Sequence, residues 1–248
     1  MDFVKMEGLG NDFVVLAGPR SPTPSQIAAW CDRRRGIGAD GVLVVTPGAG
    51  RVRMEYWNAD GSAAEMCGNG LRCVARYARD RDLAPDGEFI VDTAVGPRRV
   101  TVGPEAVRAE MGPVQVGTGV VEIAGYRGTP VSVGNPHAVV LVDDCYAVPL
   151  AAAGPLFETD PAFPGGANAG FATVIDPQRI ALRVWERGVG ETLACGTGAV
   201  AAVAAARDNG LVGDAVTVHL PGGDLQVEIT DGVAWIEGPA RTVYRGTL

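Results

Sequence analysis

Lysine and histidine are the scarcest of the residues from which cofactor and metal sites are built. The only lysine is Lys5, and the only histidines are His137 and His219. Lys5 falls in a segment that reads as the first strand, a poor place for the Schiff-base lysine that pyridoxal phosphate requires. Two histidines are too few for a histidine-rich zinc site, which usually takes three or four His or Cys ligands. The composition therefore argues against a pyridoxal-phosphate enzyme and against a histidine-rich zinc site.

Positive charge and long apolar runs are also in short supply. The net charge is −8, and the only basic triplet, residues 33–35, is typical of a solvated face. Phosphate binding needs clustered lysine and arginine, so we expect no nucleic-acid partner. No stretch of 18 apolar residues is present, and the first residues lack the pattern of a signal peptide. We expect a cytoplasmic location and no membrane partner.

Cysteine occurs five times, but no Cys-x-x-Cys pair is present. An odd count without that motif argues against a disulfide scaffold in a chain of this size. Cys31, Cys73 and Cys145 are best interpreted as small buried apolar residues. Cys67 and Cys195 stand apart, because each begins a Cys-Gly-x-Gly segment.

These two cysteines lie at corresponding places in an internal repeat. Residues 53–70 (RMEYWNADGSAAEMCGNG) align with residues 181–198 (ALRVWERGVGETLACGTG), with Cys67 on Cys195 and Asn58 on Glu186. Further segments match in the same order along the chain: Gly10-Asn11 with Gly134-Asn135, 89–96 with 216–223, and Gly112-Pro113 with Gly238-Pro239. Collinear matches of this kind indicate an ancient duplication.

Each half predicts the same succession of elements. An alternating strand and a glycine-rich turn with the cysteine precede an alanine-rich helix, and short strands follow. The predicted helices are 71–79 and 199–207, and the predicted strands include 51–57, 88–93, 98–102, 216–220 and 224–229. We expect an α+β fold of two pseudo-symmetric halves. Each would be a short-stranded sheet or half-barrel wrapped around a central apolar helix, with the active site in the cleft between them.

The predicted halves meet in a glycine-rich stretch. Residues 1–117, together with the C-terminal segment 241–248, form the N-terminal half that carries Cys67. Residues 118–240 form the C-terminal half that carries Cys195. The glycines within 115–130 predict a loose connection between them.

A cysteine at the start of a helix is in a chemically active place. Unpaired N–H groups and the positive end of the helix dipole converge there, which lowers the pKa of a thiol. The same N–H groups, from Gly68 and Asn69 in one half and Gly196 and Thr197 in the other, predict a site for a carboxylate.

Two such cysteines suit the inversion of an α-carbon. One group must remove a proton from one face while another returns a proton to the opposite face. Pseudo-twofold symmetry would supply both groups, one as thiolate and one as thiol. Helix N-termini aimed at the substrate carboxylate would stabilise the enediolate that forms.

Four segments, GLGNDFVV from Gly8, ADGSAAEMCGNG from Ala59, GNPH from Gly134 and ERGVGETLACGTGA from Glu186, resemble the signatures of the diaminopimelate epimerase family. The similarity extends from Lys5 to Tyr244. The resemblance implies that Cys67 and Cys195 are the acid/base pair, with His137 and Glu186 assisting the proton transfers. It also implies a fold of two similar halves, without metal or cofactor.

The resemblance further implies how a diamino-dicarboxylate substrate is held. Arg187 matches the partner of the distal carboxylate, and Tyr244 matches a tyrosine at the family's homodimer interface. The matching substrate-binding amides are Asn11, Asn58, Asn135 and Asn168. Two positions depart from the family's pattern: Glu7 stands where histidine is frequent, and Gly41 stands where some members have a glutamine.

Other interpretations remain open from the sequence. A proline racemase-like enzyme usually has histidine where this chain has Asn69. A related histidine racemase would share the cysteines but lack a partner for a distal carboxylate, a role for which Arg187 is available. A thiol redox protein would ordinarily carry Cys-x-x-Cys, and a non-catalytic binding protein would not need two matching thiols.

Overall fold

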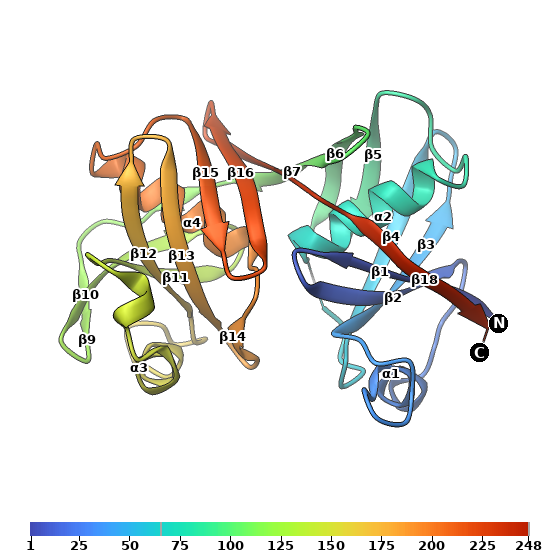
Figure 1. Cartoon of the computed structure of the whole chain (residues 1–248), viewed down its shortest axis with the longest axis horizontal. Coiled ribbons are helices and arrows are strands. Elements are labelled where there is room, and N and C mark those ends of the chain that lie inside the picture. The colour runs from blue at the N-terminus through green and yellow to red at the C-terminus, as the bar shows by residue number, and fades with distance from the viewer. Residues whose placement is uncertain (65, 248) are drawn as a thin grey trace. The chain divides into compact units, whose positions relative to one another are not determined.

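The computed structural model describes residues 1–64 and 66–247. The described chain forms two compact units, Met1–Ala109 with Gly238–Leu248, and Glu110–Glu237. Figure 1 shows one long helix set among short strands in each unit. The first unit is thus built from both ends of the chain, whereas the second is one continuous segment.

Unit 1 contains a sheet, the long helix α2 and a short helix α1. Its elements are β1 (Asp2–Gly8), β2 (Asn11–Ala17), α1 (Pro24–Cys31), β3 (Gly41–Pro47), β4 (Arg51–Asn58), α2 (Gly68–Arg79), β5 (Glu88–Thr93), β6 (Gly96–Val102) and β18 (Arg241–Thr247). Strand β7 (Val107–Pro113) contains the residues at which the chain passes into unit 2.

Unit 2 repeats this plan with one more helix. Its elements are β8 (Gln115–Val116), β9 (Val121–Ile123), β10 (Tyr126–Ser132), β11 (Pro136–Leu141), the 3-10 helix η1 (Cys145–Ala147), α3 (Leu150–Glu158), β12 (Asn168–Asp176), β13 (Arg179–Glu186), β14 (Gly190–Thr192), α4 (Gly196–Asp208), β15 (Ala215–Leu220), β16 (Gly223–Thr230) and β17 (Val233–Gly238). Three of them, β8, β9 and β10, occupy the stretch 115–130. The expectation of a loose connection there is wrong, because short paired strands occupy the stretch; Gly119 and Gly125 lie between strands, whereas Gly128 lies within β10.

The strand pairing confirms the internal repeat. In unit 1, β1–β2, β3–β4 and β5–β6 pair antiparallel, whereas β2–β3 and β4–β5 pair parallel. In unit 2, β10–β11, β12–β13 and β15–β16 are antiparallel, and β11–β12 and β13–β15 are parallel. The register corresponds as well, since Phe13 lies opposite Gly41 and His137 lies opposite Asn168. The two pseudo-symmetric halves are therefore confirmed.

Each long helix is buried among the strands of its own unit. Every residue of α4 from Gly198 to Ala206 is buried, as expected for a helix that is apolar on all faces. The small alanine side chains let the strands approach it closely. Both helices begin at the first glycine after the cysteine, earlier than the alanine pattern predicts, because the Cys-Gly-x-Gly segment itself forms the first turn.

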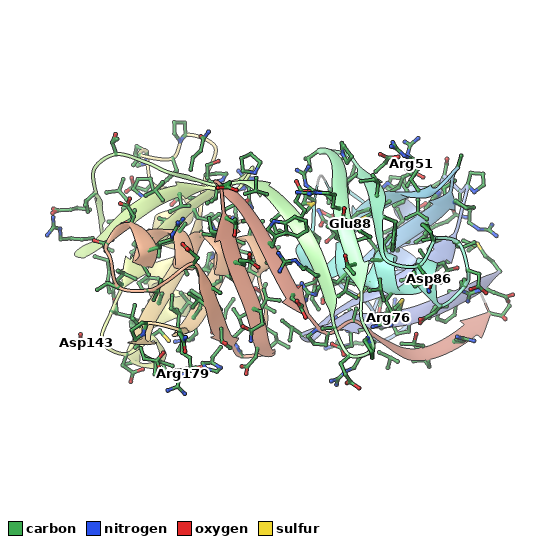
Figure 2. The ribbon with its side chains drawn as sticks, turned by 90° about the horizontal axis from the view of Figure 1, so that it is seen from above. Arg51, Arg76, Asp86, Glu88, Asp143 and Arg179 are labelled. Carbon is green, nitrogen blue, oxygen red and sulfur yellow. The ribbon has the colours of Figure 1, made fainter. Side chains whose placement is uncertain are left out.

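Charged side chains lie mostly on the outside of each unit (Figure 2). Arg51 pairs with Asp92 in unit 1, and Arg179 pairs with Asp176 in unit 2. Exposed pairs of this kind contribute about 0–1 kcal/mol to stability, so the fold depends on the buried helices and strands instead. No helix in residues 1–64 or 66–247 is long and apolar enough to cross a membrane.

Candidate active site

Cys67 caps the N-terminus of α2. Its backbone is extended, with φ −142° and ψ 117°, as an N-cap residue requires. The side chain therefore folds back over the first turn, where Sγ accepts a hydrogen bond from the N–H of Gly70 at 3.4 Å. A Cβ atom on Gly70 would lie 3.3 Å from the side chains of Leu43 and Met54, so only glycine fits there without a shift.

Cys195 occupies the same position at the start of α4. Its φ is −122° and its ψ is 111°, and Sγ accepts from the N–H of Gly198 at 3.4 Å. A Cβ on Gly198 would lie 3.3 Å from that sulfur. The prediction that both cysteines stand at helix N-termini is confirmed. The glycine three residues after each cysteine, Gly70 or Gly198, leaves room for the sulfur over the first turn.

The two sulfurs differ in the acceptor that faces them. The Cys67 thiol donates to Oδ1 of Asn11 over 3.5 Å, whereas the Cys195 thiol donates to Oε2 of Glu186 over 3.2 Å. Glu186 is the last residue of β13, and its other oxygen accepts from the Thr192 hydroxyl at 2.6 Å. Among the contacts of the described residues, each sulfur has an N–H donor and an oxygen acceptor, an amide oxygen for Cys67 and a carboxylate oxygen for Cys195.

The expected lowering of the thiol pKa is wrong for Cys195. Burial raises the pKa of Cys195 well above its ordinary value, and the charge of Glu186 raises it further. Hydrogen bonds from Thr197 and Gly198 act in the opposite direction but are outweighed. The helix terminus alone suggested a thiolate, but a side chain only 4% exposed loses more from desolvation than it gains from the dipole. Cys195 is therefore held as a neutral thiol.

His137 lies in a chain of polar contacts that leads to Cys195. Its Nε2 is 3.1 Å from Oδ1 of Asn135, whose Nδ2 donates to the Thr197 hydroxyl at 3.3 Å. The Thr197 oxygen is in turn 3.5 Å from the Cys195 sulfur. The ring is fully buried, and burial followed by the charge of Arg187 lowers the pKa of His137 to about 3. The imidazole is thus neutral and is linked to the sulfur through Asn135 and Thr197.

The segment after Glu186 turns sharply. Gly188 has φ +76°, and the N–H of Val189 donates to the Glu186 carbonyl at 3.1 Å. The backbone N–H of Arg187 donates to Oδ1 of Asn168 at 2.9 Å, and its guanidinium reaches the Gly165 carbonyl at 2.5 Å. The turn leaves the Arg187 side chain exposed.

Three other predicted residues, Asn58, Asn69 and Tyr244, lie in unit 1. Asn58 donates to the Ser62 hydroxyl at 3.0 Å, within the turn after β4. Asn69 donates to Oδ1 of Asn11 at 3.4 Å. Tyr244 lies on the exposed strand β18, with its ring edge-on to Phe3 at a centroid distance of 6.0 Å.

The two departures from the family pattern have local explanations. Glu7 accepts from the N–H of Gly10 at 3.0 Å and so stabilises the turn between β1 and β2. A Cβ on Gly41 would lie 2.5 Å from the Trp57 carbonyl and 2.7 Å from the Tyr56 ring. On this backbone no larger side chain fits at position 41.

Sequence reasoning missed four residues that hold these groups in place: Asp40, Arg72, Glu158 and Thr192. Glu158, for example, accepts from the Trp185 indole and from the N–H of Gly188, both at 2.8 Å, and so fixes the turn after Glu186. Asp40 and Glu158 lie about 30 residues from their partners, so spacing carried no signal for them. Arg72 and Thr192 lie near their partners in sequence, but at positions to which no recognised motif assigned a role. In the described part of the chain, three or more His, Cys, Asp or Glu side chains nowhere gather as metal ligands would.

The repeated unit with a cysteine-capped helix defines a class of protein. A solved structure of a hydroxyproline epimerase from Agrobacterium vitis has the same fold, with a TM-score of 0.76 and 17% identity, over 99% of this chain and 91% of that one. At that identity the likeness shows the fold alone. The chain thus shares its fold with a protein described as an epimerase.

Sequence comparison identifies the family within that class. The family model for diaminopimelate epimerase matches residues 3–117 and again residues 129–243. The diaminopimelate epimerase of Moorella thermoacetica is 43% identical over 99% of this chain and 98% of its own length. That of Halorhodospira halophila is 45% identical over 100% of this chain and 95% of its own. The chain belongs to the diaminopimelate epimerase family.

Proposed function

We propose that this chain is an isomerase that interconverts LL-2,6-diaminopimelate and meso-diaminopimelate, a step in lysine and peptidoglycan precursor biosynthesis. The observation that carries the proposal is the pair of helix-capping cysteines, Cys67 and Cys195, at equivalent positions of two units with the same strand pairing. Each sulfur has both a donor and an acceptor, which suits a group that must alternate between thiolate and thiol.

The mechanism transfers one proton at each face of the α-carbon. One cysteine, as thiolate, removes the α-proton, and the other, as thiol, delivers a proton to the opposite face. Burial and the charge of Glu186 raise the pKa of Cys195, which favours the thiol form of that residue before it delivers its proton. In the reverse direction the roles exchange. Positioned proton transfer of this kind contributes about 10²–10⁴-fold to the rate.

The carboxylate next to the reacting carbon needs donors when the enediolate forms. In the proposal these are the first-turn N–H groups of Gly68 and Asn69 on α2 and of Gly196 and Thr197 on α4. In the direction in which Cys195 is the base, Glu186 first accepts the Cys195 proton and leaves the thiolate, a role that its 3.2 Å contact with the sulfur supports. His137, neutral because burial lowers its pKa to about 3, orders the Asn135–Thr197 contacts beside that sulfur.

The distal half of the substrate carries a second amino group and a second carboxylate. We propose that Arg187 pairs with that carboxylate, because a guanidinium makes two parallel hydrogen bonds to it. Its exposed side chain and its place directly after Glu186 support this role. The amides of Asn11, Asn58, Asn135 and Asn168 complete the substrate contacts. No cofactor or metal enters the mechanism.

Assembly and location extend the proposal. Tyr244 and Val243 are large side chains on an exposed strand, 43% and 55% accessible, and aromatic residues are enriched at interfaces. We propose that β18 forms a twofold homodimer interface. We also propose a cytoplasmic location, since the substrate is a biosynthetic intermediate.

The test is incubation with LL-diaminopimelate in D₂O, following α-deuterium and the isomer ratio. Wild-type protein should incorporate deuterium and approach the LL/meso equilibrium. Cys67→Ala and Cys195→Ala should each abolish epimerisation, because each lacks the proton carrier for one face. Cys73→Ala is the matched control, since Cys73 lies fully buried on α2 and should leave most of the activity. Substantial turnover by either active-site variant would refute the two-base mechanism.

A further inference from the structure

The amide of Asn11 lies between Cys67 and a carboxylate. Its Nδ2 donates to Oδ2 of Asp40 at 2.8 Å, while its Oδ1 accepts from the Cys67 thiol at 3.5 Å. An ionised carboxylate only accepts hydrogen bonds, so the NH₂ end of the amide must face Asp40. The carbonyl end is thereby directed at Cys67.

Asp40 is itself firmly held. Its Oδ1 accepts from the Arg33 guanidinium at 2.7 Å, and its Oδ2 also accepts from the backbone N–H of Asp12 at 3.1 Å. Asp12 pairs with the buried Lys5 at 2.7 Å and with Arg33 at 2.7 Å. Burial opposes ionisation of Asp12, but hydrogen bonds from Arg33 and Lys5 prevail and lower its pKa to about 2. This ionic cluster fixes the carboxylate that orients Asn11.

The orientation is supported from the opposite side. The Arg72 guanidinium, fully buried on α2, donates to Oδ1 of Asn69 at 2.8 Å. Because a guanidinium only donates, the NH₂ end of Asn69 must point away from it. That end lies 3.4 Å from Oδ1 of Asn11. The direction of both amides is therefore set by a charged group at each end of the chain of contacts.

In unit 2 an acceptor oxygen also faces the catalytic sulfur, but a different side chain supplies it. There the residue that corresponds to Asn11, Asn135, donates to the Thr197 hydroxyl, and the acceptor at Cys195 is the carboxylate of Glu186. At Cys67 the acceptor is a neutral amide, which can present either end. An amide in that place needs a group that fixes its direction.

We propose that Asp40 is a positioning residue that, through the amide of Asn11, keeps an acceptor oxygen on the sulfur of Cys67. The inference rests on the proposed acid/base role of Cys67. A helix N-terminus favours the thiolate, and a thiolate stabilised too far is a poor base for an α-proton. The Asn11 carbonyl favours the S–H form and so preserves the basicity that both directions of the reaction need.

The charged or titratable groups around Cys67 belong to several elements. Arg72 and Cys73 on α2 both interact electrostatically with it, and Glu7 on β1 interacts with those two. Asp40 lies beyond Asn11 on the loop before β3. None of the other three is altered by a change at Asp40, so the effect of that change on Cys67 is specific.

The test measures the pH dependence of iodoacetamide alkylation at Cys67, read by peptide mass spectrometry. Asp40→Asn frees the Asn11 amide to turn its NH₂ toward the sulfur. The alkylation midpoint should move to lower pH, with about tenfold faster alkylation at pH 7. Asp40→Glu keeps an acceptor-only group and should restore the wild-type midpoint. In the epimerase assay Asp40→Asn should lower kcat more than it raises KM.

A double-mutant cycle separates positioning from charge. In an Asn11→Ala background, Asp40→Asn should no longer move the midpoint, because the amide through which it acts is gone. Asp12→Asn removes a charge from the same cluster without freeing Asn11, and should also leave it unmoved. An equal shift in both backgrounds, or no shift at all, would overturn the inference. If Asp40→Asn does not fold, Asp40→Ser provides the same comparison. Alkylation is read without turnover, so a failure of the proposed epimerase activity would be seen separately.

Discussion

Replacing Glu186 by glutamine should change two properties of Cys195 in opposite directions. The amide keeps the size of the side chain but removes the negative charge 3.2 Å from the sulfur. Epimerisation should slow, because the thiol loses the group that accepts its proton. Alkylation of the same thiol should become faster, because that charge is one of the causes of its raised pKa.

The magnitude follows from the distance. Two unit charges 3.2 Å apart interact by about 5 kcal/mol at an effective dielectric constant of about 20. The Thr192 hydroxyl, 2.6 Å from the other carboxylate oxygen, already offsets part of that charge. If removing the charge recovers only about 1.4 kcal/mol of the remaining repulsion, the thiolate fraction of Cys195 rises about tenfold. The loss of a positioned proton acceptor lowers kcat by about 10²–10⁴-fold.

The assay pairs deuterium incorporation from LL-diaminopimelate with iodoacetamide alkylation of Cys195 at pH 7. Glu191→Gln is the matched control. It lies on the neighbouring strand β14, pairs with Arg183 at 2.8 Å, and should leave both rates near wild type. If Glu186→Gln slowed alkylation, or left turnover unchanged, the assignment of Glu186 as the proton partner of Cys195 would be wrong.

Three further predictions follow from the same contacts. Burial, followed by the charge of Arg187, lowers the pKa of His137 to about 3, so its contribution to stability is complete above pH 6.5 and is lost as pH falls toward 3. Phe13 occupies the equivalent position of unit 1, so His137→Phe is a suitable replacement. Between pH 7 and pH 5 its free energy of unfolding, measured in urea, should fall by about 2 kcal/mol less than that of the wild type. Equal losses would contradict this. Arg187→Ala should lower kcat/KM on LL-diaminopimelate by about 10²-fold, and Arg187→Lys should recover only part of it, whereas near-normal efficiency in the alanine variant would favour a racemase for a mono-carboxylate. Mild oxidant should inactivate the free protein through Cys67 and Cys195, with protection by substrate and recovery on reduction, and activity indifferent to oxidant would contradict a facing pair.

The parts of the fold that sequence predicted are those in which local pattern and burial agree. The two helices, the repeat and the strands around them follow from alternation and from an alanine run with no polar face. The stretch 115–130 was missed because strands of two, three and seven residues between glycine turns have too little periodicity to be recognised.

The part of the site whose residues lie close together in the sequence could be predicted. Cys67 and Cys195 were found because the cap and the glycine it needs lie within three positions. The raised pKa of Cys195 was not foreseeable, because it depends on burial and on a carboxylate brought close by β13. Asp40 was missed for a similar reason, because it directs an amide 29 residues away in the chain, and such a contact leaves no pattern in the sequence.

The first and last strands are neighbours in unit 1, with Asp2 opposite Thr247 and Lys5 opposite Tyr244. β18 follows unit 2 in the chain, so the sheet of unit 1 cannot be completed until β18 has been synthesised. Unit 2 is one uninterrupted segment and has all its strands before that moment. During translation the second unit is therefore free to fold first, while the first waits with the β1 edge open. Linking β18 directly to β1 and opening the chain at an exposed turn of unit 2 would make unit 1 the continuous segment and reverse the order in which the two units are synthesised.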